Sequence, residues 1–277
     1  MTDLAELETI MRTLRDPARG CPWDLAQDFR SIVPHTLEEA YEVADAIERD
    51  DFQALPGELG DLLFQVVFYC QLAAEAERFS LREVVATLAR KLVARHPHVF
   101  ADAAGDDAAS VARDWEARKA DERRAAAGGR ASELDDVPLA LPALSRAAKI
   151  QRRAARVGFD WPHVDGARAK LDEECAELDA ARGAGSADDI EDELGDVLFA
   201  VVNLARHLDI EPERALRRAT AKFEARFRAL EACAAEDGRG LDELSAAQLD
   251  RLWEAVKRGV PAATPGPKRG DRRGGTS

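Results

Sequence analysis

Paired cysteines and long apolar segments are both missing from this chain of 277 residues. Its four cysteines lie far apart with no Cys-x-x-Cys motif, a pattern typical of free thiols in a cytosolic protein. The most apolar run, Leu62 to Ala74, is interrupted by Gln65 and Gln71, so no membrane-spanning helix is predicted. The first residues also lack the basic and apolar regions of a signal peptide. We therefore expect a cytoplasmic protein with no membrane partner.

Basic residues are in deficit, with 39 Lys and Arg against 53 Asp and Glu, a net charge of −14 and a pI of about 4.9. Nucleic acid is not expected as a partner, because phosphate recognition needs a basic face. Sustained polar–apolar alternation is also absent, and there are only 12 Pro and 18 Gly, which favours an all-α fold. The length and a hydrophobic content of 46% suit one large domain or two modest ones.

Acidic residues are concentrated in residues 172–196, which hold eleven Asp or Glu and one base, Arg182. Residues three apart on a helix share a face. Two helices packed side by side would therefore bring four carboxylates together, those of Glu174, Glu177, Glu193 and Asp196. Such a like-charged group must be solvated, protonated or neutralised by hard cations, and oxygen-only ligands suit Mg²⁺ or Mn²⁺.

The same acidic pattern occurs earlier in the chain, always 135 positions before, as between Glu39 and Glu174. The earlier acids are Glu38, Glu39, Glu42, Glu58 and Asp61. Glu-Leu-Gly-Asp is found at residues 58–61 and again at 193–196, and in both places an apolar helical pattern follows. The chain therefore contains an internal duplication, which favours two domains.

We predict an N-terminal repeat over residues 1–105, a connector over 106–140, a C-terminal repeat over 141–258 and a disordered tail over 259–277. The connector is expected to contain one helix, Val111 to Ala127. Apolar periodicity predicts further helices over residues 4–14, 58–77, 81–95, 144–157, 164–182 and 187–207, a helix starting after an N-cap at Thr36, and a last helix pair that carries Lys222, Arg226 and Trp253.

Several other readings of these motifs are open. Glu39 follows Thr36 by three residues and could complete a capping box instead of binding metal. The His-Pro-His segment at residues 96–98 could bind a transition metal, but an ending loop is favoured because no Cys or further His lies nearby. A di-iron site needs Glu-x-x-His, which neither repeat supplies. A merely solvated acidic face is disfavoured because the pattern is duplicated, precedes apolar helices and lacks basic partners at i+4.

Lys222 and Arg226 lie one turn apart on a predicted helix, as Lys91 and Arg95 do in the first repeat. Carboxylates that bind divalent cations, together with basic groups on another helix, would suit a magnesium-bound polyphosphate. If two or more metals bind, one could activate a water, and Glu173 or Glu174 could orient or deprotonate that water.

Four motifs together resemble the MazG nucleoside triphosphate pyrophosphohydrolases. They are Glu-Glu-x-x-Glu followed by Glu-Leu-Gly-Asp, Arg-His-Pro-His-Val-Phe at residues 95–100, Gly-Cys-Pro-Trp-Asp at 20–24 and Val-Gly-Phe-Asp-Trp at 157–161. The resemblance covers about residues 4–258 in a two-repeat form. It implies helical bundles assembled as a homodimer, and Mg²⁺-dependent hydrolysis of NTPs and dNTPs to a monophosphate and pyrophosphate.

The resemblance also implies roles for individual residues. The expected catalytic residues are Glu173, Glu174, Glu177, Glu193 and Asp196, of which the last four would bind metal. The expected nucleotide contacts are Lys170, Glu173, Asp189, Lys222, Arg226 and Trp253. Glu39, Glu42, Glu58 and Asp61 form a second expected metal site, in a repeat that we expect to be structural or weakly active. The alternatives are a narrower specificity, of the dUTP, dCTP or phosphoribosyl-ATP type, and a non-catalytic nucleotide-sensing module.

Overall fold

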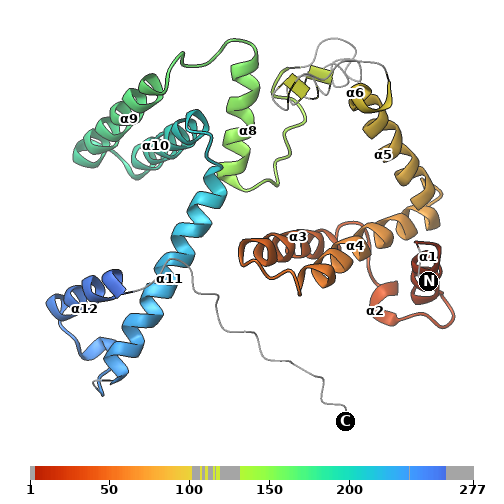
Figure 1. Ribbon diagram of the computed structural model, residues 1–277, viewed down its shortest axis with the longest axis horizontal. Coiled ribbons are helices and arrows are strands. Elements are labelled where there is room, and N and C mark those ends of the chain that lie inside the picture. The colour runs from red at the N-terminus through yellow and green to blue at the C-terminus, as the bar shows by residue number, and fades with distance from the viewer. Residues whose placement is uncertain are drawn as a thin grey trace. The chain divides into compact units, whose positions relative to one another are not determined.

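The computed structural model describes residues 4–101, 132–236 and 238–259, together with residues 107, 110, 111, 115, 117 and 118. The regular structure of these residues is entirely helical, which confirms the all-α prediction (Figure 1). The chain divides into two compact units, residues 1–122 and 123–277. Most of the predicted connector helix and nearly all of the predicted tail lie outside the described residues.

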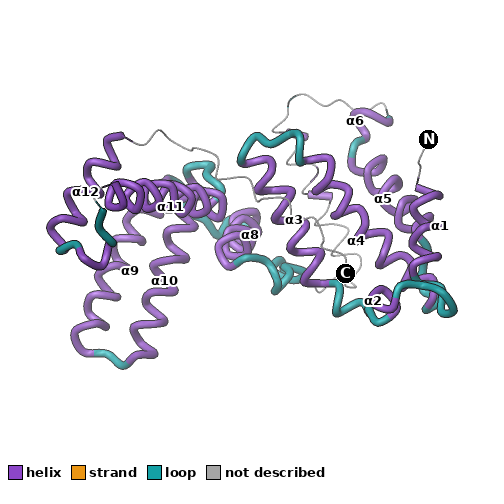
Figure 2. Tube along the Cα trace, turned by 90° about the horizontal axis from the view of Figure 1, so that it is seen from below, coloured by secondary structure: helices purple, strands orange, loops and turns teal. Residues whose placement is uncertain are grey.

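Each unit is built around one long antiparallel helix pair. In the first unit the helices are α1 (Leu4–Leu14), α2 (Pro22–Leu25), α3 (Val33–Glu48), α4 (Leu55–Glu75), α5 (Leu81–Arg95) and α6 (Pro97–Phe100). In the second they are α8 (Ala143–Arg156), α9 (Val164–Ala184), α10 (Ala187–His207), α11 (Pro212–Glu236) and α12 (Ala246–Gly259). Figures 1 and 2 show α3 beside α4 and α9 beside α10, each pair joined by a short loop.

Local signals explain several helix boundaries. Ser80 and Ser186 begin α5 and α10 with capping boxes, in which the serine hydroxyl accepts a hydrogen bond from the backbone N–H three residues later. Helix α5 ends at Arg95, before Pro97, as predicted. Gly20 ends the turn after α1, where a Cβ atom would lie 2.4 Å from the Leu14 carbonyl oxygen.

The predicted starts of two helices are wrong by three or more residues. Helix α3 begins at Val33, so Thr36 is inside it, and its hydroxyl lies 3.0 Å from the Tyr69 hydroxyl instead of capping the helix. The capping-box explanation of Glu39 therefore does not apply. Helix α4 begins at Leu55, three residues before the predicted start, because a proline such as Pro56 is tolerated in the first turn, where its missing N–H has no helical partner.

The core of the first unit is a cluster of buried side chains from α1, α4 and α5 and the loop before α3: Met11, Ile32, Val67, Phe68, Cys70, Leu72 and Leu81. Arg15 fixes α1 to α4 with a bidentate ion pair, in which Nη2 lies 2.7 Å from Glu75 Oε2, and its guanidinium lies over the Phe68 ring. In the second unit, Arg206 and His207 at the end of α10 hold Asp160 in the loop between α8 and α9.

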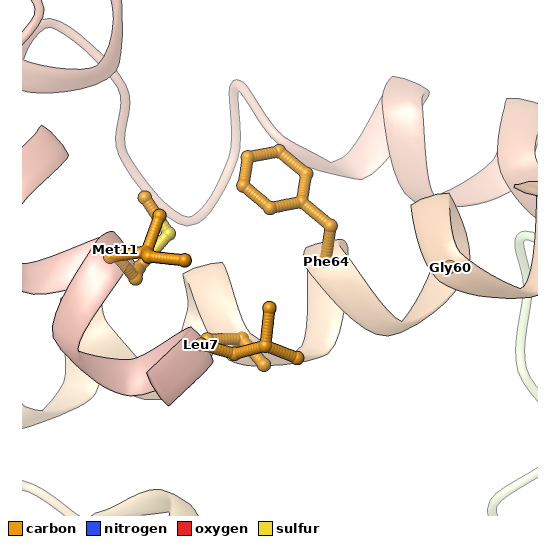
Figure 3. A pocket seen from close by; sticks show the side chains of 6 residues that line it. Leu7, Met11, Gly60 and Phe64 are labelled. Atoms are coloured by element: carbon orange, nitrogen blue, oxygen red, sulfur yellow. The ribbon is translucent and has the colours of Figure 1, made fainter. Parts of the chain in front are cut away.

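A small apolar pocket lies between α1 and α4 (Figure 3). It is lined by Leu7, Ile10, Met11, Gly60, Phe64 and Val67. None of these side chains is polar, so the pocket offers no group that could orient a nucleotide or hold a metal.

Both long helix pairs leave large apolar side chains exposed. On α4 these are Leu59, Leu63, Phe64 and Val66, and on α10 they are the equivalent Leu194, Leu198, Phe199 and Val201, all between 37% and 49% exposed. We call these two sets the duplicated apolar face. Helices α5 and α11 expose further large apolar groups, including Leu88 and Phe223. None of the helices that the structure describes is both long enough and apolar enough to cross a membrane.

Candidate metal centre

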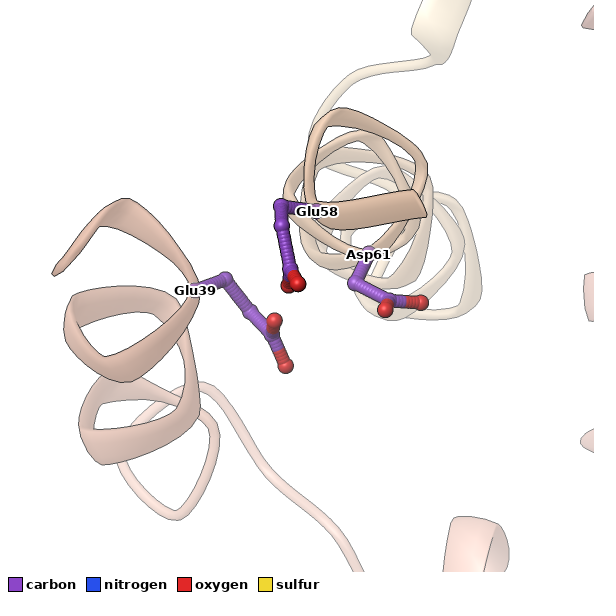
Figure 4. Close-up of side chains that lie close together, drawn as sticks. All are labelled: Glu39, Glu58 and Asp61. Carbon is purple, nitrogen blue, oxygen red and sulfur yellow. The ribbon is translucent and has the colours of Figure 1, made fainter. Parts of the chain in front are cut away.

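The first carboxylate group lies between α3 and α4. Glu39 extends from α3 toward Glu58 and Asp61 on α4, and one oxygen from each of the three lies within 4.8 Å of the others (Figure 4). A periodicity of three or four residues places Glu58 and Asp61 on the same face of α4, which explains why both face α3. The predicted meeting of acids from two neighbouring helices is therefore present in the first repeat.

The electrostatics of this group are dominated by burial and like charge, which Arg49 only partly offsets at Glu58. Burial raises the pKa of Glu39, and the charges of Asp61 and Glu42 raise it further. Burial also raises the pKa of Glu58, with additional contributions from Glu42 and Asp61. Glu42 thus acts on the group from α3, although its oxygens are not among the three that lie closest together. A divalent cation would remove the repulsion that these shifts report.

The second carboxylate group lies between α9 and α10. Oxygens of Glu174, Glu177 and Glu193 lie within 4.8 Å of one another, and the Glu174 side chain is buried. Asp196 is exposed and lies on α10 one turn after Glu193, and the structure does not include it in this close group. Three of the four predicted ligands are therefore brought together in each repeat. The shared positions are Glu39 with Glu174, and Glu58 with Glu193.

A basic residue neutralises part of the second group. Lys170 lies on α9 one turn before Glu173 and Glu174. Its Nζ lies 2.6 Å from Glu174 Oε1 and 2.8 Å from Glu173 Oε1. Burial raises the pKa of Glu177, Lys170 opposes that effect, and Glu174 and Glu193 add to it. The predicted lack of basic partners at i+4 did not consider the other direction along the helix, and Lys170 lies four residues before Glu174. The spacing of four residues is visible in the sequence and could have predicted the ion pair of Lys170 with Glu174.

The other predicted nucleotide contacts are Asp189 on α10, which also carries Glu193, and three residues on α11 and α12. Asp189 belongs to the capping box of α10, where its Oδ2 accepts hydrogen bonds from the backbone N–H and hydroxyl of Ser186. These bonds lower its pKa. Its position at a helix start therefore has a structural explanation that sequence reasoning missed, although Ser186 three residues earlier signalled it.

Lys222 and Arg226 lie on α11, which packs on α12 and α8 and to a smaller extent on α10, whereas α9 packs chiefly on α10. Trp253 of α12 contacts the ring of Phe223 at a centroid distance of 5.3 Å. The structure thus places Arg226 near α12 and does not show it at the carboxylates. Its buried Nε has no hydrogen-bond partner among the described residues, so a donor is left over for an anion.

The two groups offer oxygen atoms only. Carboxylate-only sets suit Mg²⁺ and Mn²⁺, and soft or imidazole ligands would be needed to favour zinc. Raised carboxyl pKa values in both groups indicate that added positive charge would be accommodated. His96 and His98 do not join either group; the Nδ1 atom of His96 lies 2.7 Å from the Leu92 carbonyl oxygen, at the end of α5. The residues present therefore fit a hard divalent cation in each repeat.

Comparison with known proteins identifies the family in which this pair of carboxylate groups occurs. The sequence model of the MazG nucleotide pyrophosphohydrolase domain matches twice, over residues 27–100 and 165–230. The chain belongs to this family. Each matched MazG segment contains one complete carboxylate group, so the duplication inferred from the acid spacing is a duplication of the whole MazG domain.

Curated relatives extend the MazG match over nearly the whole chain. A nucleoside triphosphate pyrophosphohydrolase of Escherichia coli K12 is 48% identical over 262 residues, covering 93% of this chain and 98% of that protein. A Thermotoga maritima protein named nucleoside triphosphate pyrophosphohydrolase/pyrophosphatase MazG is 43% identical, covering 92% and 95%. A nucleoside triphosphate pyrophosphohydrolase of Mycolicibacterium smegmatis is 39% identical over 140 residues, covering 50% of this chain and 42% of that protein.

Proposed function

We propose that this chain hydrolyses nucleoside triphosphates to a nucleoside monophosphate and pyrophosphate in a reaction that depends on Mg²⁺, for which Mn²⁺ can substitute. The observation that carries the proposal is the group of three carboxylates between α9 and α10 in a chain of the MazG family. The names of the two relatives that match over most of the chain support the reaction. The donor chemistry supports the metal, because a triphosphate without cations would be repelled by these acids.

Glu174, Glu177 and Glu193 would hold the metal, with Asp196 as a further ligand one turn along α10. When bound, Mg²⁺ supplies neutralising charge for the triphosphate and lowers the pKa of a coordinated water. Glu173 lies next to Glu174 and its side chain is 59% exposed, so it is available to orient the attacking water and accept its proton. Water attacks the α-phosphorus, the bond to the oxygen bridging to the β-phosphorus breaks, and pyrophosphate leaves with the electron pair.

Lys170, Lys222, Arg226 and Trp253 would contact the nucleotide, and Asp189 would do so from the start of α10. Lys170 already lies at the carboxylates, and the unpartnered Nε of Arg226 supports an anion contact on α11. Trp253 is the aromatic group of this set, and it lies against Phe223. For Lys222, Arg226 and Trp253 to act at the carboxylates, α11 and α12 must approach them in the substrate complex or come from a second subunit.

A second copy of the chain is the partner that we propose for the duplicated apolar face. Eight large apolar side chains at equivalent positions of α4 and α10 are exposed within their own units, and burial against a second copy would remove them from water. Light scattering on a size-exclusion column should show a dimer. Leu198→Glu should shift it toward the monomer mass, whereas Leu139→Glu, at an exposed position in the segment before α8, should leave it dimeric. A monomeric wild-type chain would rule out the homodimer.

The first carboxylate group is proposed as a second metal site in a structural or weakly active repeat. It retains Glu39, Glu58 and Asp61 in one place. Helix α5 ends at Arg95, so Lys91 and Arg95 lie at the end of their helix, whereas Lys222 and Arg226 lie within the longer α11.

The proposed activity is tested by measuring pyrophosphate and monophosphate from a panel of NTPs and dNTPs, with Mg²⁺ and with a chelator. Metal-dependent release of both products in equal amounts supports the proposal. Release confined to one base or sugar would point to a narrower specificity. Metal and nucleotide binding without any release would point to a sensing module, and neither binding nor release would reject the proposed function.

A further inference from the structure

Lys170 forms an ion pair with Glu174, a carboxylate that is also a proposed metal ligand. Its ammonium lies 2.6 Å from Oε1 of Glu174, whose side chain is only 9% exposed, and 2.8 Å from Oε1 of Glu173. The hydrogen bonds that the ammonium donates to these two carboxylates raise the pKa of Lys170. Glu174 is the most buried member of its group, so it is the acid that gains most from a nearby positive charge.

An ammonium and a divalent cation cannot both use this carboxylate without repelling each other. The oxygens of Glu174, Glu177 and Glu193 converge within 4.8 Å, so a cation held by all three would lie close to the Lys170 ammonium. Lysine carries its charge on a flexible four-carbon stem, and this side chain is 36% exposed, so the ammonium can swing away from Glu174 without moving α9.

The first repeat has no lysine at the position equivalent to Lys170. The residue 135 positions before Lys170 is His35. Its Nδ1 lies 3.8 Å from Glu38, the equivalent of Glu173, and its ring contacts Trp23 at 5.8 Å. In the part of the chain that the structure describes, no cation within 4 Å of Glu39 is recorded, and burial and neighbouring acids raise the pKa of that group.

We propose that Lys170 is an exchangeable counter-ion of the second repeat. In the metal-free protein it neutralises Glu174, and when divalent cations bind it is released and turns its ammonium to a phosphate oxygen of the incoming nucleotide. This inference rests on the proposed function of the same site. It makes metal binding and nucleotide binding mutually reinforcing in the second repeat, because each favours the released position of Lys170.

The exchange is tested by titrating Mn²⁺ into the full chain and following free Mn²⁺ by electron paramagnetic resonance. All proteins carry Glu58→Gln, which removes a ligand of the first group and so isolates the second. Lys170→Met keeps the length and helix propensity of the side chain but removes the competing charge. The matched control is Arg168→Met, because Arg168 lies on the same helix but pairs with Asp172, outside the carboxylate group.

Without nucleotide, Lys170→Met should bind Mn²⁺ about two- to fivefold more tightly than the parent, as expected when an ion pair worth up to about 1 kcal/mol no longer competes. Arg168→Met should change the affinity less than twofold. The affinity for an α,β-methylene triphosphate analogue, which cannot be cleaved at this bond, should rise strongly with Mn²⁺ in the parent and in Arg168→Met. In Lys170→Met this rise should be several-fold smaller.

Two results would overturn the exchange while leaving the proposed function in place. Equal effects of the two substitutions on Mn²⁺ affinity would mean that only net charge matters. Weaker Mn²⁺ binding in Lys170→Met would mean that Lys170 supports the metal-bound form. A parent protein that binds no Mn²⁺ in the second repeat, shown by the same affinity after Glu193→Gln, would reject the proposed function itself and the exchange with it.

Discussion

The two repeats share their acids but differ in what surrounds those acids. Glu39 and Glu58 in one repeat, and Glu174 and Glu193 in the other, occupy the same two positions in a helix pair. Asp61 completes the first group, whereas Glu177 completes the second. Lys170 forms an ion pair with Glu174 of the second group, and a histidine occupies the equivalent position in the first repeat. The carboxylates alone therefore do not distinguish the two repeats, and we propose that the neighbouring basic and aromatic groups determine which repeat is active.

The largest expected difference between the repeats is in catalysis. Glu193→Gln removes a proposed ligand of the second group and should lower kcat/KM for pyrophosphate release by about 100-fold or more, given the usual cost of disturbing a metal site. Glu58→Gln is its equivalent in the first repeat and should lower kcat/KM by less than about threefold. The two variants are compared at saturating Mg²⁺. A larger loss in Glu58→Gln would place catalysis in the first repeat.

The next effect should be equal in the two repeats, because it concerns packing and not chemistry. Val67 and Val202 occupy equivalent positions, and both are buried, at 3% and 0% exposure. Either Val→Ala substitution should lower the free energy of unfolding by about 2 kcal/mol through lost burial and a residual cavity. Urea denaturation followed by circular dichroism measures this. If only one of them destabilises the protein, the two helix pairs do not have equivalent cores.

The smallest effect concerns the metal-free protein. The pKa of Glu58 is raised in the folded state, so its contribution to stability is fully present below its ordinary pKa and is lost as pH rises through the folded value. At pH 7 the ionised group therefore opposes folding, and Glu58→Gln should raise the Tm in chelator by on the order of 1 °C. The gain should vanish near pH 4. A Tm that falls at pH 7 would show that Glu58 is already compensated there.

The sequence predicted the helices well where a local signal fixes the boundary. The segment around Pro97 specifies where α5 ends, and the predicted start of α10 at Ala187 is also correct. The starts of α3 and α4 were misplaced because Thr36 and Pro56 each suit more than one position in a helix, and tertiary contacts such as that of Thr36 with Tyr69 decide between them.

The candidate site was predictable at the level of residue positions, because helical periodicity determines which acids share a face. Which three of four acids converge depends on side-chain conformation and on the packing of two helices, and neither is encoded by spacing. The pairing of Lys170 with Glu174 is local and could have been found. The position of Arg226 near α12 depends on contacts of α11 that no short motif specifies.

The most direct test of catalysis in the second repeat is a crystal structure of the full chain with Mn²⁺ and the α,β-methylene triphosphate analogue, with manganese located by anomalous scattering. We predict manganese among Glu174, Glu177 and Glu193 with the triphosphate beside it, and the Lys170 ammonium on a phosphate oxygen instead of on Glu174. The first repeat should bind no triphosphate, although its carboxylate group can hold manganese. A triphosphate bound at Glu39, Glu58 and Asp61, with the second group empty, would contradict the assignment of catalysis to the second repeat.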